Sequence, residues 1–306
     1  MKDTSSDDMR KNQISKGTVL VTGAKGFIGT ELVKQLKHKG LRVIQVDVLD
    51  LKEDDYIKCD ISSDDILKII PENVDAIVHL AGLSRDSDCK DKMYVCFNTN
   101  VMRTIRLMEF AIQKNSKQFI FASSEWVYGE TKDNELKNES SAVEVLKLNS
   151  EYALSKAVSE SALRQMSISN NCSVTVCRFG IVYGPRAKPM TAVESIFLDV
   201  LNKDIVEVGS LRSGRCFIHV EDIASGIIST IGLKGFNIIG IEGEKLVTMA
   251  DIIDSSKKIT GKNPEVVQKN PENYNIRLIS NDNILKTSDW KPKISLDAGL
   301  KTLLKK

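Results

Sequence analysis

The sequence is poor in the features that several classes of protein need. It has three histidines and six cysteines with no Cys-x-x-Cys pair, so we expect no structural zinc site and no bound metal. The net charge is +2, with acids and bases mixed along the chain, which argues against a nucleic-acid partner. No apolar run reaches membrane-spanning length, and polar residues 1–16 indicate a loose tail rather than a signal peptide.

The six cysteines are scattered singly along the chain. Such cysteines are typical of a reducing cytoplasm, where we place the protein. Hydrophobic residues make up 42% of the 306, which is ample for a core. Apolar strands alternate with amphipathic helices, a pattern that favours an α/β fold with a Rossmann-like, doubly wound parallel sheet. The main predicted strands are 18–22, 42–48, 56–60, 74–80, 117–122 and 173–179, and the main predicted helices are 101–113, 149–167, 221–231 and 247–259.

The stretch TVLVTGAKGFIG, residues 18–29, organises the rest of the chain. It predicts a buried strand, a glycine turn and a helix that opens near Gly26. Gly23 would allow the tight turn, Gly26 would let a pyrophosphate approach the backbone, and Gly29 would let the helix pack closely on the sheet. The helix N-terminus, with Phe27 and Ile28, would then bind the phosphates of a dinucleotide. A glycine-rich loop without a ligand is the alternative.

An acidic residue follows the second predicted strand at the position that reads the adenosine ribose. A carboxylate at Asp47 would accept bonds from both ribose hydroxyls and repel a 2′-phosphate, so the pattern predicts NAD as the cofactor, although Lys52 lies close in sequence. Asp60 and Ile61 would lie beside the adenine, or Asp60 would cap the next helix. We therefore expect an NAD-binding Rossmann domain over residues 17–180, with a return segment at 215–238. Residues 181–306 would form mainly a smaller α/β substrate-binding lid.

Small residues end the fourth predicted strand and would leave room for the cofactor, which we expect to contact Leu80, Ala81 and Gly82. We interpret His79, inside that strand, as a core histidine. Polar residues 86–91 indicate a loop over the site, and we expect Ser84 just before them to contact the substrate.

Tyr152 and Lys156 lie four residues apart on a predicted helix, so both project from one face. A lysine ammonium and a positive nicotinamide ring would lower the pKa of the tyrosine from about 10. The phenol could then exchange a proton with a sugar hydroxyl while hydride moves to or from the cofactor. Ser123 and Ser124 end the fifth predicted strand, where doubly wound sheets bind ligands. An ordinary helix face and a strand-end serine pair are the alternatives.

These motifs together resemble the extended short-chain dehydrogenase/reductase family, in particular its NAD-dependent nucleotide-sugar epimerase/dehydratase branch. The resemblance extends from about Thr18 to the C-terminus. It rests on TGAKGFIG, Asp47, the Asp60–Ile61 pair, HLAG at His79, SSEWVYG at Ser123, YALSK at Tyr152, RFGIVYGP at Arg178, RCFIHVEDIA at Arg215 and DWKPKISLDAGL at Asp289.

The resemblance implies roles for single residues. Tyr152 would be the general acid or base, Lys156 would anchor the nicotinamide ribose, and Ser124 would polarise the substrate oxygen. Asn100 would contact the cofactor from the helix after the fourth strand. Arg215 would bind a nucleotide diphosphate, with Arg277 as a second candidate, since guanidinium groups suit phosphate oxygens; a surface ion pair is the alternative for each. The resemblance also implies a homodimer built by the helices at Val101 and Asn149, and a place in cell-surface polysaccharide biosynthesis.

Three residues depart from the family pattern. Arg103 stands where the family has a glycine, and Ile181 replaces an asparagine that often contacts the substrate. Glu125 follows the active serine, where the 4,6-dehydratases carry an acid, but Trp126 replaces the glutamate that comes next in them. Glu125 could be an acid–base group, a partner for a sugar hydroxyl, or a solvated turn residue.

The sequence thus predicts an NAD-dependent nucleotide-sugar epimerase that acts through a transient keto intermediate. A nucleotide-sugar 4,6-dehydratase and a keto-sugar reductase are alternatives within the family. A non-catalytic dinucleotide-binding regulator is the alternative of another class, because fold does not dictate function.

Overall fold

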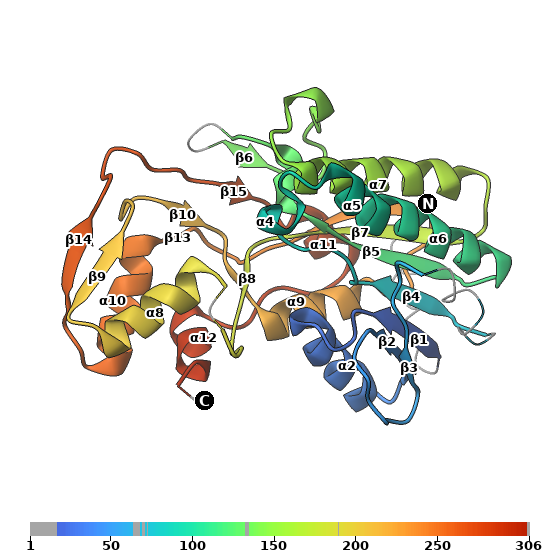
Figure 1. Ribbon diagram of the computed structural model, residues 1–306, viewed down its shortest axis with the longest axis horizontal. Helices are drawn as coiled ribbons and strands as arrows, with labels where there is room; N and C mark the ends of the chain where they lie inside the picture. The colour runs from blue at the N-terminus through green and yellow to red at the C-terminus, as the bar shows by residue number, and fades with distance from the viewer. Residues whose placement is uncertain are drawn as a thin grey trace, which may run out of the picture.

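The computed structural model describes residues 17–63, 68, 71, 73–131, 135–188 and 190–304; the expected N-terminal tail and the helix expected after Ser62 lie outside them. A seven-stranded sheet forms the centre of the molecule, and all its strands are parallel (Figure 1). The order β12-β7-β5-β4-β1-β2-β3 confirms the predicted doubly wound fold. The strands are β1 (Thr18–Thr22), β2 (Arg42–Asp47), β3 (Tyr56–Lys58), β4 (Ala76–His79), β5 (Gln118–Ser124), β7 (Ser173–Phe179) and β12 (Phe236–Ile241).

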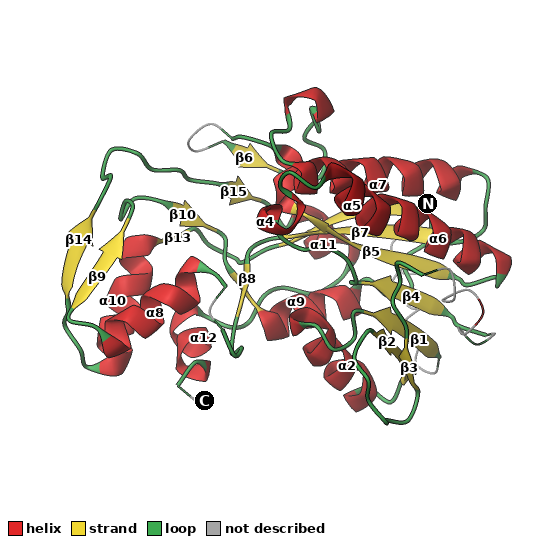
Figure 2. Cartoon of the chain, in the orientation of Figure 1, coloured by secondary structure: helices red, strands yellow, loops and turns green. Residues whose placement is uncertain are grey.

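Helices cover both faces of this sheet (Figure 2). On one face lie α6 (Arg103–Gln113) and α7 (Glu151–Ile168), which bury Leu107, Phe110 and Leu163 against the strands. On the other face lie α2 (Phe27–His38) and α9 (Val220–Ser229), whose buried residues join the strands in a second core. Both faces of the sheet are therefore buried, as expected for strands made of continuous apolar residues.

A smaller unit, whose three helices are drawn at the left of Figure 1, has its own core. Its helices are α8 (Ala192–Asn202), α10 (Met249–Thr260) and α12 (Leu296–Thr302), and its strands are β9 (Ile205–Val208) and β14 (Glu265–Gln268). Capping boxes start two of these helices, Thr191 with Glu194 in α8 and Thr248 with Asp251 in α10. This unit falls within residues 181–306, where we expected the lid, and it is called the lid below.

Short elements complete the fold. They are α4 (Asp86–Cys89), α5 (Met93–Phe97), the π-helix η1 (Asn98–Met102), the 3₁₀ helices η2 (Glu125–Tyr128) and η3 (Val145–Lys147), α11 (Asp282–Thr287), β6 (Leu136–Lys137), β8 (Val182–Tyr183), β10 (Gly214–Arg215), β11 (Ile218–His219), β13 (Val247–Thr248) and β15 (Leu278–Ile279). Within the described part of the chain, no helix combines the length and the apolar character needed to cross a membrane.

Two expectations about the segment after β4 are wrong, and one strand at the edge of the sheet was not predicted. Residues 86–91 are not only a loop, because Asp86–Cys89 forms α4. The cysteines are not all single, because Cys89 and Cys96 form a disulfide, with their Cα atoms 5.1 Å apart. The edge strand β12, which extends the return segment past residue 238 to Ile241, was not predicted. Its fully extended pairing with β7 is a tertiary contact that a short apolar run does not reveal.

Candidate active site

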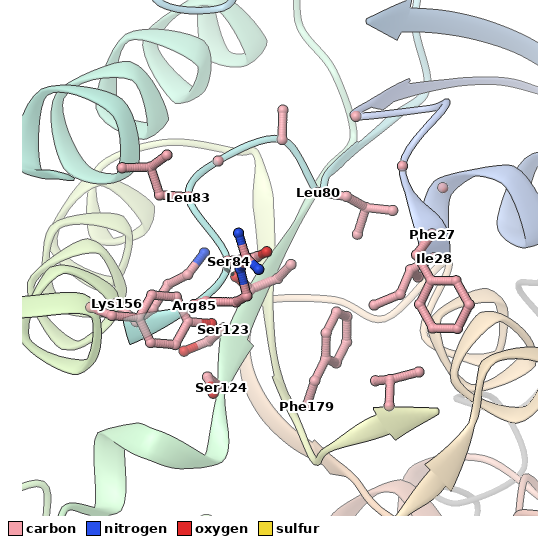
Figure 3. A pocket seen from close by; sticks show the side chains of 18 of the residues that line it. Phe27, Ile28, Leu80, Leu83, Ser84, Arg85, Ser123, Ser124, Lys156 and Phe179 are labelled. Atoms are coloured by element: carbon pink, nitrogen blue, oxygen red, sulfur yellow. Dashed lines mark hydrogen bonds between the residues drawn. The ribbon is translucent and has the colours of Figure 1, made fainter. Parts of the chain in front are cut away.

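A cavity of about 680 Å³ runs along the carboxyl ends of the sheet strands, between the sheet and the lid. This is the edge where open α/β sheets bind their ligands, and the volume suits a small-molecule site. Every predicted cofactor, catalytic and substrate residue lines it except Asn100, Arg215 and Arg277. Figure 3 shows Phe27 and Ile28 on one side of the cavity and Lys156, Ser123 and Ser124 on the other.

The glycine turn has the geometry that the sequence predicted. Gly23 adopts a left-handed φ of +67°, and a Cβ there would also meet the backbone of Ala81 at 2.9 Å. A Cβ on Gly29 would overlap the Gly23 carbonyl, so α2 can approach the turn only without a side chain at this position. A Cβ on Gly26, the N-cap of α2, would have one close neighbour, the Gly23 oxygen at 3.1 Å. Gly26 therefore leaves an open cradle at a helix N-terminus, which fits a pyrophosphate.

Asp47 ends β2 on the cavity wall. Its carboxylate accepts bonds from the backbone N–H groups of Lys25 and Val48, each at 2.8 Å. These bonds hold the carboxylate beside the glycine turn, where a ribose of a dinucleotide would lie. Asp60 also lines the cavity, and its Oδ1 accepts a bond from the Ser62 N–H at 2.8 Å. The residues present thus fit NAD at both the phosphate and the ribose positions.

Tyr152, Lys156 and Ser124 meet at the other end of the cavity. Tyr152 is 8% exposed, and the Lys156 ammonium lies 5.8 Å from the centre of its ring. The ammonium donates a hydrogen bond to the Ala122 carbonyl at 2.8 Å, which fixes its position at the end of β5. The edge of the Trp126 ring packs on the Tyr152 ring, with 6.3 Å between centroids. A phenol, an ammonium and a hydroxyl therefore share one buried corner of the site.

The pKa values in this corner differ from the expectation. Burial raises the pKa of Tyr152 to about 12; the Ser124 hydroxyl opposes this shift and the charge of Glu125 adds to it. Burial lowers the pKa of Lys156 to about 8, with Glu160 opposing the change. The expectation that the lysine lowers the tyrosine pKa is therefore wrong, because desolvation dominates. When bound, NAD supplies a hydride acceptor and a positive ring that favours the phenolate.

The two strand-end serines have different surroundings. Ser123 is 2% exposed and donates a hydrogen bond to Glu160 Oε1 at 2.5 Å. Glu160 also accepts two bonds from Arg178, at 3.1 Å and 2.7 Å, in a buried ion pair. Ser124 instead accepts a bond from the Trp126 N–H at 3.3 Å and interacts with Tyr152. The Ser124 hydroxyl is thus the one suited to a reacting oxygen, while Ser123 ties β5 to α7.

Asn100 lies in the π-helix η1 and does not reach the cavity wall. Its side-chain oxygen accepts a bond from the Leu83 N–H at 2.9 Å, and its amide donates to the Leu83 carbonyl at 3.1 Å and to Ser155 at 3.0 Å. A Cβ on Gly82, whose φ is +153°, would lie 2.8 Å from the Asn100 oxygen. Asn100 therefore holds the loop after β4 against α7. Arg103 begins α6 just after this turn, away from the cavity.

A group of buried charges lies behind the substrate end. Glu125 is 1% exposed, and its Oε1 pairs with Arg277 Nη1 at 3.4 Å. Burial raises the pKa of Glu125, and the charges of Arg277 and Arg215 oppose this shift. Glu242 is fully buried directly behind Gly180, and burial followed by repulsion from Glu125 raises its pKa well above the ordinary value. Glu125 is therefore not a solvated turn residue.

The two arginines expected to bind a diphosphate are engaged with the protein. Arg277 Nη2 donates to the Gly129 carbonyl at 2.8 Å, and Arg215 Nη1 donates to the Gly214 and Asn275 carbonyls, each at 2.7 Å. Neither residue lines the cavity in this ligand-free structure. Both arginines lie close enough to Glu125 for their charges to oppose the rise in its pKa.

Sequence reasoning missed cavity residues on the lid side. Phe179 and Arg186 line the cavity, as do Met190 and Thr191 at the start of α8. The Arg186 guanidinium donates to Glu194 Oε1 at 2.7 Å and to the Val182 carbonyl at 2.7 Å. Arg186 directly follows the RFGIVYGP motif, so this motif was the signal that could have located it.

The family model described as "NAD dependent epimerase/dehydratase family" matches residues 19–234. The chain belongs to this family. Among solved structures, it is similar to MoeE5 in complex with UDP-glucuronic acid and NAD, with a TM-score of 0.83, 25% identity, and coverage of 94% of this chain and 98% of the other. The chain is thus an NAD-dependent enzyme of the epimerase/dehydratase family, and its extended short-chain dehydrogenase/reductase architecture is confirmed.

Two curated relatives show how varied the family is. A putative UDP-glucose 4-epimerase from Methanocaldococcus jannaschii is 26% identical, with 94% of this chain and 97% of the relative covered. A protein from Arabidopsis thaliana is 27% identical over 92% of this chain; it is a trifunctional UDP-glucose 4,6-dehydratase, UDP-4-keto-6-deoxy-D-glucose 3,5-epimerase and UDP-4-keto-L-rhamnose reductase. The chain spans 46% of the length of that relative.

Proposed function

We propose that the chain is a nucleotide-sugar epimerase that uses NAD catalytically. The observation that carries the proposal is the meeting of Tyr152, Lys156 and Ser124 at one end of a cavity whose other end is the glycine turn. NAD held by the glycine turn would supply a hydride acceptor that is regenerated in each turnover. Tyr152, as its phenolate, would take the proton of a sugar hydroxyl as the carbon that bears it is oxidised. After the keto sugar rotates, Tyr152 would return the proton to the oxygen as the carbonyl is reduced on its other face.

Ser124 and Lys156 assist this exchange in different ways. The Ser124 hydroxyl can donate a bond to the reacting oxygen as it becomes a carbonyl. The Lys156 ammonium, fixed by the Ala122 carbonyl, can bind the nicotinamide ribose. The guanidinium groups of Arg215 and Arg277 support a nucleotide diphosphate on the substrate, and the two arginines would have to leave their backbone partners to bind it.

Dehydration of a nucleotide sugar is the second candidate, and Glu125 favours it. A buried carboxyl with a raised pKa holds a proton more readily than an exposed one, so Glu125 can protonate a departing hydroxyl. Against this, Trp126 offers no second acid next to it. A keto-sugar reductase would use the same Tyr152 and would consume reduced cofactor. A non-catalytic regulator would not need the three polar groups of the site.

The test starts from the purified protein and the nucleotide that co-purifies with it, identified by mass spectrometry. UDP-, GDP- and dTDP-sugars are then incubated with the protein, and products are followed by NMR and by absorbance of NADH. We expect a C4 or other epimer with no net NADH change. Loss of water without net redox would show dehydration, and stoichiometric NADH consumption would show a reductase. No turnover of any sugar, with NAD bound, would favour the regulator.

The proposal includes a homodimer built by the helices on one face of the sheet. Large apolar side chains are exposed along α5 and the π-helix that follows, where Met93, Tyr94, Val95 and Met102 are 46–83% exposed. Such a stripe is larger than single scattered exposures and suits a self-complementary contact. Sedimentation analysis of the wild type and of a Tyr94→Glu variant tests it. A cytoplasmic location and a role in polysaccharide biosynthesis stay predictions.

A further inference from the structure

A basic side chain stands beside the ribose-reading carboxylate but is turned away from it. The Lys25 backbone N–H donates to Asp47 Oδ2 at 2.8 Å, so the lysine backbone lies against the cavity wall formed by Asp47. Its ammonium, however, donates two hydrogen bonds to Glu53, at 2.8 Å to Oε1 and 2.6 Å to Oε2. The same ammonium lies 5.4 Å from the centre of the Tyr56 ring.

The lysine backbone is fixed, so only side-chain rotation decides where its charge lies. Lys25 sits inside the glycine turn, which is closed by the bond from the Gly26 N–H to the Gly23 carbonyl at 3.0 Å. Glu53 and the Tyr56 ring both contact the ammonium. The Lys25 side chain is 17% exposed and the Glu53 side chain 41%. The pair also keeps the pKa of Glu53 below its ordinary range, with the Lys25 hydrogen bond as the largest cause.

The chemistry of the cofactor gives this arrangement a consequence. NAD and NADP differ by a phosphate on the adenosine ribose, and dinucleotide sites accept that phosphate with a nearby cation. Lys25 is a cation whose backbone N–H contacts Asp47, and its ammonium is paired with Glu53. We infer that Glu53 is a specificity-determining residue, which holds Lys25 away from the ribose and so adds to the exclusion of NADP by Asp47.

This inference rests on the dinucleotide site and not on which sugar reaction the enzyme catalyses. The experiment therefore measures binding alone. The holoenzyme is loaded with NADH, and its fluorescence is followed as NAD⁺ or NADP⁺ displaces the bound nucleotide. The ratio of the two displacement constants is compared between the wild type and Glu53→Gln. We expect NADP⁺ to gain about tenfold relative to NAD⁺ in Glu53→Gln, as for one new charge-assisted hydrogen bond.

Two further variants isolate Lys25 as the group that is released. In Glu53→Gln combined with Lys25→Met, the gain for NADP⁺ should disappear. In Glu53→Gln combined with Lys52→Met, which removes the other nearby lysine, the gain should persist. A gain that survives Lys25→Met but is lost with Lys52→Met would overturn the assignment to Lys25.

Asp50→Asn is the matched control, because it also removes one negative charge from the segment between β2 and β3. Asp50 pairs with Lys58 at 2.7 Å rather than with Lys25. The displacement ratio should stay within about twofold of wild type, as for the loss of an exposed ion pair. An equal gain in Asp50→Asn, or no gain in Glu53→Gln, would overturn the inference. Failure of the wild type to bind either nucleotide would overturn the dinucleotide site itself and this inference with it.

Discussion

The guanidinium of Arg186 lies over the ring of Phe27, with its central carbon 3.7 Å from the ring centroid. Phe27 is the first residue of α2, in the glycine turn, whereas Arg186 comes from the segment that leads into the lid. Arg186 also bonds Glu194, the N3 residue of α8. One side chain thus joins the phosphate end of the site to the lid, and the contact is attractive because the ring face is electron-rich.

Replacement of Arg186 by leucine should weaken NAD⁺ binding by up to about thirtyfold, since a desolvated cation–π contact is worth about 2 kcal/mol and about 1.4 kcal/mol corresponds to a factor of ten. The NAD⁺ affinity of Arg186→Lys should fall between those of the wild type and Arg186→Leu, because lysine keeps the charge but loses the planar stacking. Isothermal titration of NAD⁺ measures both. Arg212→Leu is the control, because Arg212 lies 3.7 Å over the Tyr274 ring but outside the cavity. An equal loss of affinity in Arg212→Leu would contradict a specific role for Arg186.

Replacement of Tyr152 by phenylalanine should lower the turnover number by about 10³-fold, as expected when a proton-transfer group is removed. Binding of NAD should change little, because the ring remains in the cluster with Cys89, Cys96 and Leu83. Tyr183→Phe is the control, because Tyr183 is buried but lies outside the cavity. Its activity should stay within about twofold of wild type if the Tyr152 hydroxyl is the group that transfers the proton. Full turnover by Tyr152→Phe would rule out the proposed proton transfer.

Lys156 should make the stability of the ligand-free protein depend on pH in the alkaline range. Its pKa is lowered from 10.5 to about 8 by burial, so between these values the unfolded chain binds more protons than the folded protein. Stability from this group therefore rises with pH from about 8 to about 10.5, by about 3 kcal/mol at most, at 1.4 kcal/mol for each pKa unit. Urea unfolding of wild type and Lys156→Met across this range should show the difference. Parallel curves for the two proteins would contradict the prediction.

Replacement of Arg178 by methionine should destabilise the fold by about 3–5 kcal/mol, because Glu160 would keep a buried charge without its partner. The pair is 2.7 Å apart, with side chains 3% and 8% exposed. Adding Glu160→Gln to Arg178→Met should restore part of the loss, since no buried charge then remains. Chemical denaturation of the single and double variants measures this. A double variant less stable than either single variant would argue that the pair is favourable beyond the charge it compensates.

Replacement of Glu125 by glutamine should separate the two candidate reactions. The amide keeps the size of the side chain but cannot supply a proton, so a dehydratase should lose about 10²–10⁴-fold in rate. An epimerase needs no such acid and should retain activity within about tenfold, because only the pairing with Arg277 changes. Product analysis by NMR distinguishes the outcomes. Equal loss of both reactions would indicate that Glu125 binds the sugar.

Periodicity and glycine spacing predicted much of the sheet and the cofactor end of the site. Gly23, Asp47 and Tyr152 could be assigned because each lies in, or next to, a strand or helix that its own apolar pattern predicts. The positions of Arg277 and Arg186 could not, since each depends on which distant segment it meets: Arg277 reaches back to Glu125 and Arg186 reaches Phe27. The raised pKa of Tyr152 also escaped prediction, because burial is a property of the assembled site.

The same limit explains the disulfide and the edge strand. Cys89 and Cys96 are seven residues apart, and only the turn between α4 and α5 brings them together. Strand β12 contains Gly240, whose absent Cβ admits the Ser280 carbonyl at 2.8 Å, so its apolar run looks interrupted in the sequence. Both the disulfide and the strand depend on contacts with other segments, which the local sequence pattern does not predict.

Asn100 joins the loop that ends at Leu83 to Ser155, one residue before Lys156 on α7. Hydrogen bonds therefore connect the cavity wall after β4 directly to the helix that carries Tyr152 and Lys156. The cavity-lining residues Arg186, Met190 and Thr191 belong to other segments, which these hydrogen bonds do not include. A lineage could remodel these segments for a new sugar without shifting the alignment between hydride and proton transfer, which would let one catalytic unit serve many substrates.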